Sequence, residues 1–154
     1  MRFLMRLLAP LLFWVAYGMF RASPGKASRK KHDFVMRLFR FAADNNSRRA
    51  LSMYGHLLHF RGDGPQNRIQ GAIYLKRAAE MGDGKAQYQM GRIYENGYEQ
   101  VYKPDPAIAL AFYRQAASQG HPLAIRRLYD VYTQGGLGEP VDAERSDYWQ
   151  KRLP

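Results

Sequence analysis

Apolar and small residues recur along residues 33–154 at spacings of three and four, which is the period of an amphipathic helix. Pairs of alanines stand at one place in three successive segments, 36 and 38 residues apart. A residue suited to ending a helix follows each pair. The pairs are Ala42-Ala43, Ala78-Ala79 and Ala116-Ala117, and the ending residues are Asn46, Gly82 and Gly120. A period of this length with helical spacing predicts an all-α solenoid of stacked helix pairs.

A single alanine marks the first helix of each predicted pair. It lies seven residues after the second alanine of the doublet, and apolar or aromatic residues follow it on the same helical face. These marker alanines are Ala50, Ala86 and Ala124. Gly55 and Gly91 lie five residues after the first two markers. Because glycine inside a helix costs stability, we expect a neighbouring helix to approach closely at both positions.

The second helix of each pair is expected to start after a glycine-rich turn. The predicted starts are Asn67, Asp105 and Asp142, because Asn and Asp side chains accept hydrogen bonds from the free N–H groups of a helix start. Pro106 stands at the favoured first helical position. An aromatic residue follows each start by seven residues, at Tyr74, Phe112 and Trp149.

The combined pattern resembles the Sel1-like repeat (SLR), a branch of the tetratricopeptide superfamily. Residues 86–120 match best, and residues 50–82 match with Gly71 in an alanine position. Residues 124–154 depart from the pattern, since Tyr129 replaces the helix glycine and Leu153-Pro154 replaces the alanine pair. Upstream, Val35, Leu38, Phe39 and the first alanine pair fit the second helix of a partial leading repeat.

The resemblance implies a right-handed α-solenoid of about three helix-turn-helix repeats plus a leading partial repeat. We expect the solenoid domain to span residues 33–154, with repeats at about 47–82, 83–120 and 121–154. A hydrophobic helix precedes it. The resemblance also favours binding over catalysis as the function.

The first 22 residues form a separate, strongly apolar segment. Residues 3–20 contain one charge, Arg6, and as a helix they would span roughly 27 Å, about enough for a bilayer core. We therefore predict a single-pass membrane anchor in residues 1–22 and a basic linker in residues 23–32. A cleaved signal peptide is the alternative, since Gly25-Lys26-Ala27 has the small-x-small pattern of a cleavage site.

A high net positive charge suggests nucleic-acid binding, but the distribution of the charge along the chain argues against it. The net charge is +11, but residues 1–32 carry +7 without a single acid, and residues 33–154 carry only +4. We therefore expect no nucleic-acid partner. Lys26, Arg29, Lys30 and Lys31 are expected to contact anionic lipid headgroups and to favour the cytoplasmic side of a bacterial inner membrane. A periplasmic or secreted location is the alternative.

Candidate chemistry is sparse. The chain has no cysteine, so it has no disulfide or thiolate metal site, and no Ser-His-Asp arrangement has a supporting motif. His56 and His59 lie three residues apart on a predicted helix with Asp63 beyond, but they lack a convincing third ligand. We expect no enzyme activity, no metal and no cofactor.

The residues best suited to bind a protein partner are basic or aromatic. Paired arginines near the starts of two first helices suit an acidic segment, and an insertion at residues 98–102 offers aromatic anchors unless it packs back on the solenoid. The candidates are Arg48, Arg49, Arg92, Tyr98, Tyr102, Arg126 and Arg127.

The resemblance implies a non-catalytic adaptor that helps to assemble or regulate a membrane-associated complex, and we expect it to bind its partner through the groove of the solenoid. Two alternatives stay open: a secreted or periplasmic SLR effector released by signal cleavage, and a module that binds anionic lipid surfaces. The exposed end of a short solenoid also permits self-association.

Overall fold

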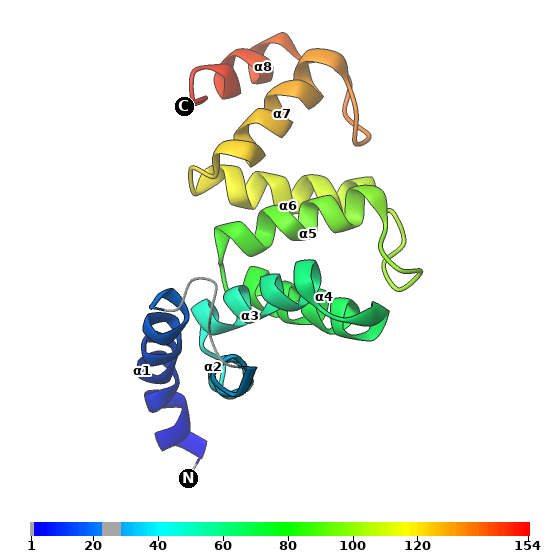
Figure 1. Cartoon of the computed structure of the whole chain (residues 1–154). Helices are drawn as coiled ribbons and strands as arrows, with labels where there is room; N and C mark the ends of the chain where they lie inside the picture. Colours follow the sequence, from blue (N-terminus) through cyan, green and yellow to red (C-terminus); the bar gives the residue numbers. More distant parts are fainter. Residues whose placement is uncertain (1, 23–28) are drawn as a thin grey trace. The chain divides into compact units, whose positions relative to one another are not determined.

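The computed structural model describes residues 2–22 and 29–154, and over this part of the chain every regular element is a helix (Figure 1). In chain order the helices are α1 (Arg2–Arg21), α2 (Arg29–Asp44), α3 (Arg48–Arg61), α4 (Gly64–Glu80), α5 (Gly84–Asn96), α6 (Pro106–Ser118), α7 (Pro122–Gln134) and α8 (Ala143–Gln150). The all-α class and the helix-pair solenoid are therefore confirmed. Lys26 and the candidate cleavage site lie outside the described residues.

The helices gather into two compact units, Met1–Ala78 and Ala79–Pro154. In the first unit α2 contacts both α1 and α3, and in the second unit α6 contacts both α5 and α7. Helix α7 also contacts α8. Each helix thus packs mainly on its neighbours in sequence, as is typical of repeat proteins.

The small residues that mark the repeats lie where the helices are packed most closely. The marker alanines Ala50, Ala86 and Ala124 are completely buried, and every alanine of the three doublets is at least 96% buried. In the second unit, the larger side chains of Tyr113 and Leu128 fill the space between these alanines. The sequence pattern therefore identified the core correctly.

Side chains cap the helices at repeating positions. Ser47, Asp83 and His121 each stand three residues before a marker alanine and accept a hydrogen bond from its backbone N–H. The predicted caps Asp105 and Asp142 do the same for α6 and α8.

The predicted cap at Asn67 is wrong. Asn67 lies inside α4, and its side-chain amide donates to the backbone carbonyl of Asp63 (2.9 Å). Helix α4 begins three residues earlier because Gly64 adopts the left-handed φ of 79° and Pro65 follows it with a φ suited to a first helical turn.

The glycines inside helices mark close helix crossings, as predicted. A Cβ added at Gly91 would lie 2.7 Å from the ring of Tyr113 in α6, and one at Gly55 would lie 2.9 Å from the backbone of Leu75 in α4. Gly71 is the second half of the α3–α4 crossing, since its Cβ would lie 2.4 Å from the backbone of His59. This contact explains why glycine replaces alanine at position 71.

Helix α1 packs against α2 and α3 in the first unit. Ala9 and Ala16 are completely buried and Phe13 is 5% exposed. The rings of Phe13 and Phe20 contact Phe39 of α2, with centroids 5.9 and 6.2 Å apart. Among the described residues, α1 is also the one helix that is long and apolar enough to cross a bilayer, a property shared by membrane anchors, signal sequences and buried core helices.

Candidate protein-interaction face

An ion pair joins the first helices of two consecutive repeats in the second unit. The guanidinium of Arg127 in α7 binds the carboxylate of Glu95 in α5 through two nitrogens, with Nη2–Oε1 at 2.5 Å and Nε–Oε1 at 3.2 Å. The hydroxyl of Tyr113 in α6 donates to the other carboxylate oxygen at 2.6 Å. Three helices therefore meet at one carboxylate, and their side chains are held in place by charge-assisted hydrogen bonds.

The pKa values of these groups reflect their mutual contacts. Burial alone would raise the pKa of Glu95, but the hydrogen bonds from Arg127 and Tyr113 outweigh it and hold that pKa below its ordinary value. Burial and the Glu95 carboxylate raise the pKa of Tyr113 far above its ordinary value. Glu95 is therefore ionised and Tyr113 is neutral at neutral pH, which keeps the network intact.

Exposed arginines flank this ion pair. Arg92 lies three residues before Glu95 on α5, and Arg126 is the neighbour of Arg127 on α7; both are exposed, and neither forms an ion pair within the described part of the chain. Asp130 lies one turn beyond Arg126 on α7. We call the surface of Arg92, Glu95, Arg126, Arg127 and Asp130 the α5–α7 face.

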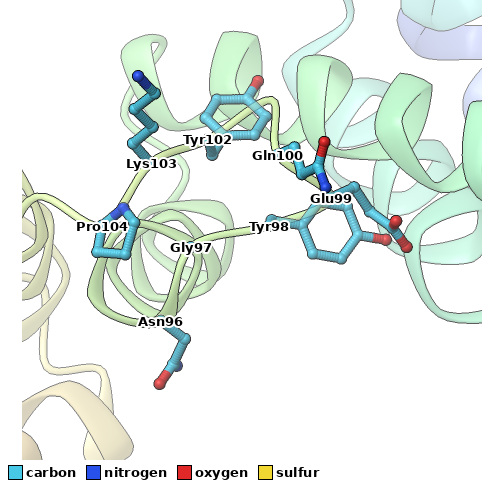
Figure 2. A pocket seen from close by; sticks show the side chains of 8 residues that line it. All are labelled: Asn96, Gly97, Tyr98, Glu99, Gln100, Tyr102, Lys103 and Pro104. Carbon is cyan, nitrogen blue, oxygen red and sulfur yellow. The ribbon is translucent and has the colours of Figure 1, made fainter.

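A short hairpin follows α5 directly. Tyr98 and Tyr102 form an antiparallel bridge, and Glu99 and Gln100 make the turn between them with φ values of 47° and 60°. Positive φ at two successive residues other than glycine is uncommon and costs conformational energy. Figure 2 shows the residues of this loop, which line an open depression of about 470 Å³.

Both predicted aromatic anchors of the hairpin are half-buried. The ring of Tyr102 packs edge-on against Tyr94 of α5, with centroids 5.5 Å apart, and burial raises the pKa of its hydroxyl. Tyr94 in turn stacks on Phe112 of α6. Val101 at the hairpin tip is 54% exposed. The loop thus rests on the helices and presents Val101 to solvent.

The other arginine pair lies in the first unit. Arg48 and Arg49 are exposed in the first turn of α3, and the guanidinium of Arg49 lies 5.0 Å from the ring centre of Trp14 in α1. The two pairs do not occupy equivalent places, since Arg48 precedes its marker alanine by two residues whereas Arg126 follows its own by two. Arg49 contacts Trp14 of another helix, and Arg127 forms its ion pair with Glu95.

The remaining candidates are the basic residues at the start of α2 and the two histidines of α3. Arg29, Lys30 and Lys31 form the first turn of α2, with Arg29 and Lys30 exposed. The Nδ1 atom of His56 hydrogen-bonds to the carbonyl of Ser52 (2.8 Å), and the rings of His56 and His59 both contact Phe60. Within the described residues, no three His, Cys, Asp or Glu side chains gather as metal ligands would.

The contribution of Glu95 was not foreseen from the sequence. A signal was present, because Glu95 and Arg127 have opposite charges and lie nine and three residues after consecutive marker alanines. This spacing alone does not establish contact, however, because the sequence does not give the shift of one first helix relative to the next along their axes. The caps at Ser47, Asp83 and His121 were missed too, although all three stand at one repeat position.

Comparisons with known proteins agree on the repeat. The Sel1 repeat family model matches residues 48–83 and 84–121. Protein SHC1 of Saccharomyces cerevisiae is 31% identical over 115 residues, which are 68% of this chain and 22% of that protein. The chitin synthase regulator SKT5 of the same yeast is 32% identical over 136 residues, 82% of this chain and 19% of that protein. The chain thus spans about a fifth of the length of these curated relatives.

A solved structure shows the same fold. The crystal structure of a Sel1 repeat protein from Oxalobacter formigenes superposes with a TM-score of 0.75 at 22% identity, over 93% of this chain and 56% of that chain. Matches to yeast and to a bacterial protein do not confirm the expected bacterial source. Residues 48–121 match two Sel1 repeats, and through them the chain belongs to the Sel1 repeat family.

Proposed function

We propose that this protein is a non-catalytic adaptor that binds an acidic segment of a protein partner through the α5–α7 face. Sel1 repeats mediate protein–protein interactions, and the observation that supports this site is the exposure of Arg92 and Arg126 beside a fixed ion pair. Arginines are suited to carboxylates because the guanidinium donates two parallel hydrogen bonds. The Glu95–Arg127 pair limits the motion of both helices, so less ordering is required on binding.

The relatives support an action on another protein. SKT5 is named as a regulator of chitin synthase, so a chain with similar repeats acts on an enzyme that is a separate protein. By analogy, the repeats of this chain would assemble or regulate a complex rather than perform chemistry.

The apolar helix α1 would hold the adaptor at a membrane, with the basic residues after it favouring the cytoplasmic side. The alternative of a released effector is less well supported, because signal cleavage would remove the helix whose Phe13 and Phe20 contact the buried Phe39 of α2. Attachment to a membrane also raises the local concentration of the adaptor near a membrane-bound partner.

The test is crosslinking in cells, followed by mass spectrometry, with the full chain and the variant Arg92→Glu/Arg126→Glu. The matched control is Arg61→Glu/Lys151→Glu, which makes the same charge change at exposed residues that do not belong to the α5–α7 face. We expect a protein partner that the control captures and the variant does not. Equal capture by both variants would exclude the α5–α7 face as the binding site.

A further inference from the structure

Helix α1 has the residue pattern of the first helix of a repeat. Counted from Ala9, Phe13 and Ala16 lie four and seven residues on, as Met90 and Ile93 do from Ala86. All six of these side chains are at least 95% buried. With α2 as the second helix, α1 therefore completes a leading repeat whose core depends on it.

The opposite side of α1 is apolar and exposed. Its large side chains are 43–79% exposed and recur at helical spacing along residues 3–15 of the helix. We call them the α1 stripe: Phe3, Leu4, Leu7, Leu8, Leu11, Trp14 and Val15. No charged residue of α1 falls within the stripe; Arg6 and Arg21 flank it on the helix, and Arg49 of α3 lies over the ring of Trp14. Seven large apolar side chains exposed together on one side of a helix form the kind of surface that binds a membrane or another protein.

Crossing a bilayer would conflict with the packing of α1. A spanning helix is surrounded by lipid, so α1 would have to leave α2 and α3. Its departure would uncover Phe39, which is 0% exposed and contacts Phe13 and Phe20. If α1 instead lay in the plane of the membrane surface, its inner side would stay on the repeat while the α1 stripe entered the lipid.

The charges around α1 favour an anionic lipid surface as the occupant. Arg6, Arg21, Arg29 and Lys30 are exposed, and no acid precedes Asp33. Basic residues beside an apolar helix face add electrostatic attraction to anionic headgroups. The α1 stripe is also broader than the two positions per heptad that a coiled-coil seam uses, which disfavours a second helix as the occupant.

We infer that α1 is the first helix of a leading repeat and attaches the chain to an anionic bilayer by lying in its surface through the α1 stripe, without spanning it. This inference rests on the membrane attachment in the proposed function and specifies its geometry.

The depth of Trp14 in the bilayer separates the two geometries. In a spanning helix Trp14 would lie about 16 Å from Phe3 along the axis, near the middle of a core about 30 Å thick. In a surface helix it would lie only about 5–10 Å below the headgroups. The full chain with Trp149→Phe keeps Trp14 as the single tryptophan. Its fluorescence is measured with phosphatidylglycerol-containing vesicles whose lipids carry bromine near the headgroup or near the chain end.

We expect partition into these vesicles, weaker partition into pure phosphatidylcholine, and quenching mainly by the shallow bromines. Leu11→Glu should lower partition about tenfold or more without changing the unfolding midpoint, because Leu11 is 63% exposed. The matched control is Leu123→Glu on α7, where leucine is 54% exposed, and it should partition normally.

Quenching mainly by the deep bromines would overturn the inference and leave membrane attachment intact. Absence of partition would overturn both, and the crosslinking experiment would then decide on the adaptor function alone. A dimer in solution that Leu11→Glu dissociates, without vesicle binding, would show that a second copy covers the α1 stripe.

Discussion

Helices α1 and α5 have the same repeat register but opposite outward chemistry. Two and six residues after the marker alanine, α1 carries the exposed Leu11 and Val15, whereas α5 carries Tyr88, which packs against the core, and the exposed Arg92. At the same two places α7 carries Arg126 and Asp130. The inward positions are apolar and buried in all three helices. The repeat thus specifies packing at one set of positions and leaves another set free to vary in chemistry from one helix to the next.

The largest expected effect tests whether α1 shares the structural role of α5. Phe13→Ala removes a side chain that is 5% exposed and contacts Phe39, so it should lower the free energy of unfolding by about 3–5 kcal/mol. Leu11→Ala, on the outward side of the same helix, should change it by less than about 0.5 kcal/mol. Chemical denaturation of both variants gives the values. Equal small effects would mean that α1 is not part of the folded repeat.

The next effect concerns the glycine position five residues after the marker. Gly91→Ala places a Cβ 2.7 Å from the Tyr113 ring and should cost about 1–3 kcal/mol. In α1 the same position is Trp14, which is 53% exposed. Gly18→Ala on α1 serves as the control, since no atom lies within 4 Å of its Cβ and alanine favours helix. Thermal unfolding should shift down for Gly91→Ala and not for Gly18→Ala.

A smaller effect is expected from the ion pair of the α5–α7 face. The side chains of Arg127 and Glu95 are 32% and 23% exposed, so we expect a coupling energy of about 1 kcal/mol. A double-mutant cycle with Arg127→Ala and Glu95→Gln measures it by denaturation. Arg126→Ala, which removes the exposed arginine that precedes Arg127, should leave the free energy of unfolding unchanged. A coupling energy of zero would show that the pair does not hold the two helices together.

The smallest effect depends on pH. His121 accepts a hydrogen bond from the Ala124 N–H, which needs an unprotonated Nδ1, and burial together with Lys85 lowers the pKa of His121. The unfolded chain therefore binds this proton first as the pH falls below about 6.5, and the free energy of unfolding drops by less than about 1 kcal/mol.

The variant His121→Asp tests this effect, because aspartate caps α5 at the equivalent position 83. The variant should lose the part of the pH dependence that His121 contributes, because the two proteins are otherwise identical. Denaturation at about pH 7 and pH 5 gives the comparison. An unchanged pH dependence in His121→Asp would rule out His121 as the source.

The sequence predicted the fold in considerable detail because each repeat position has one physical task. Close helix crossings require Gly55 and Gly91, left-handed turns follow each doublet at Asn46, Gly82 and Gly120, and Asp105 and Asp142 cap the expected helices. The prediction failed at Asn67, where the neighbouring Gly64-Pro65 turn starts the helix earlier.

The candidate site was predicted only in outline. Arg92 and Arg126 were recognised as exposed basic residues, but the engagement of Arg127 by Glu95 and of Arg49 by Trp14 depends on helices that lie apart in the sequence. The sequence likewise identified residues 1–22 as apolar, but it did not reveal that α1 has one buried side and one exposed side.

By itself, then, the sequence determined the helices, their pairing and the family, because helix period, caps and glycine positions act over a few residues and recur with the repeat. Only the tertiary structure decided which arginines are held in contacts and which side of α1 is covered. These outcomes depend on the offset and distance between neighbouring helices, which side chains from both helices set together when they pack.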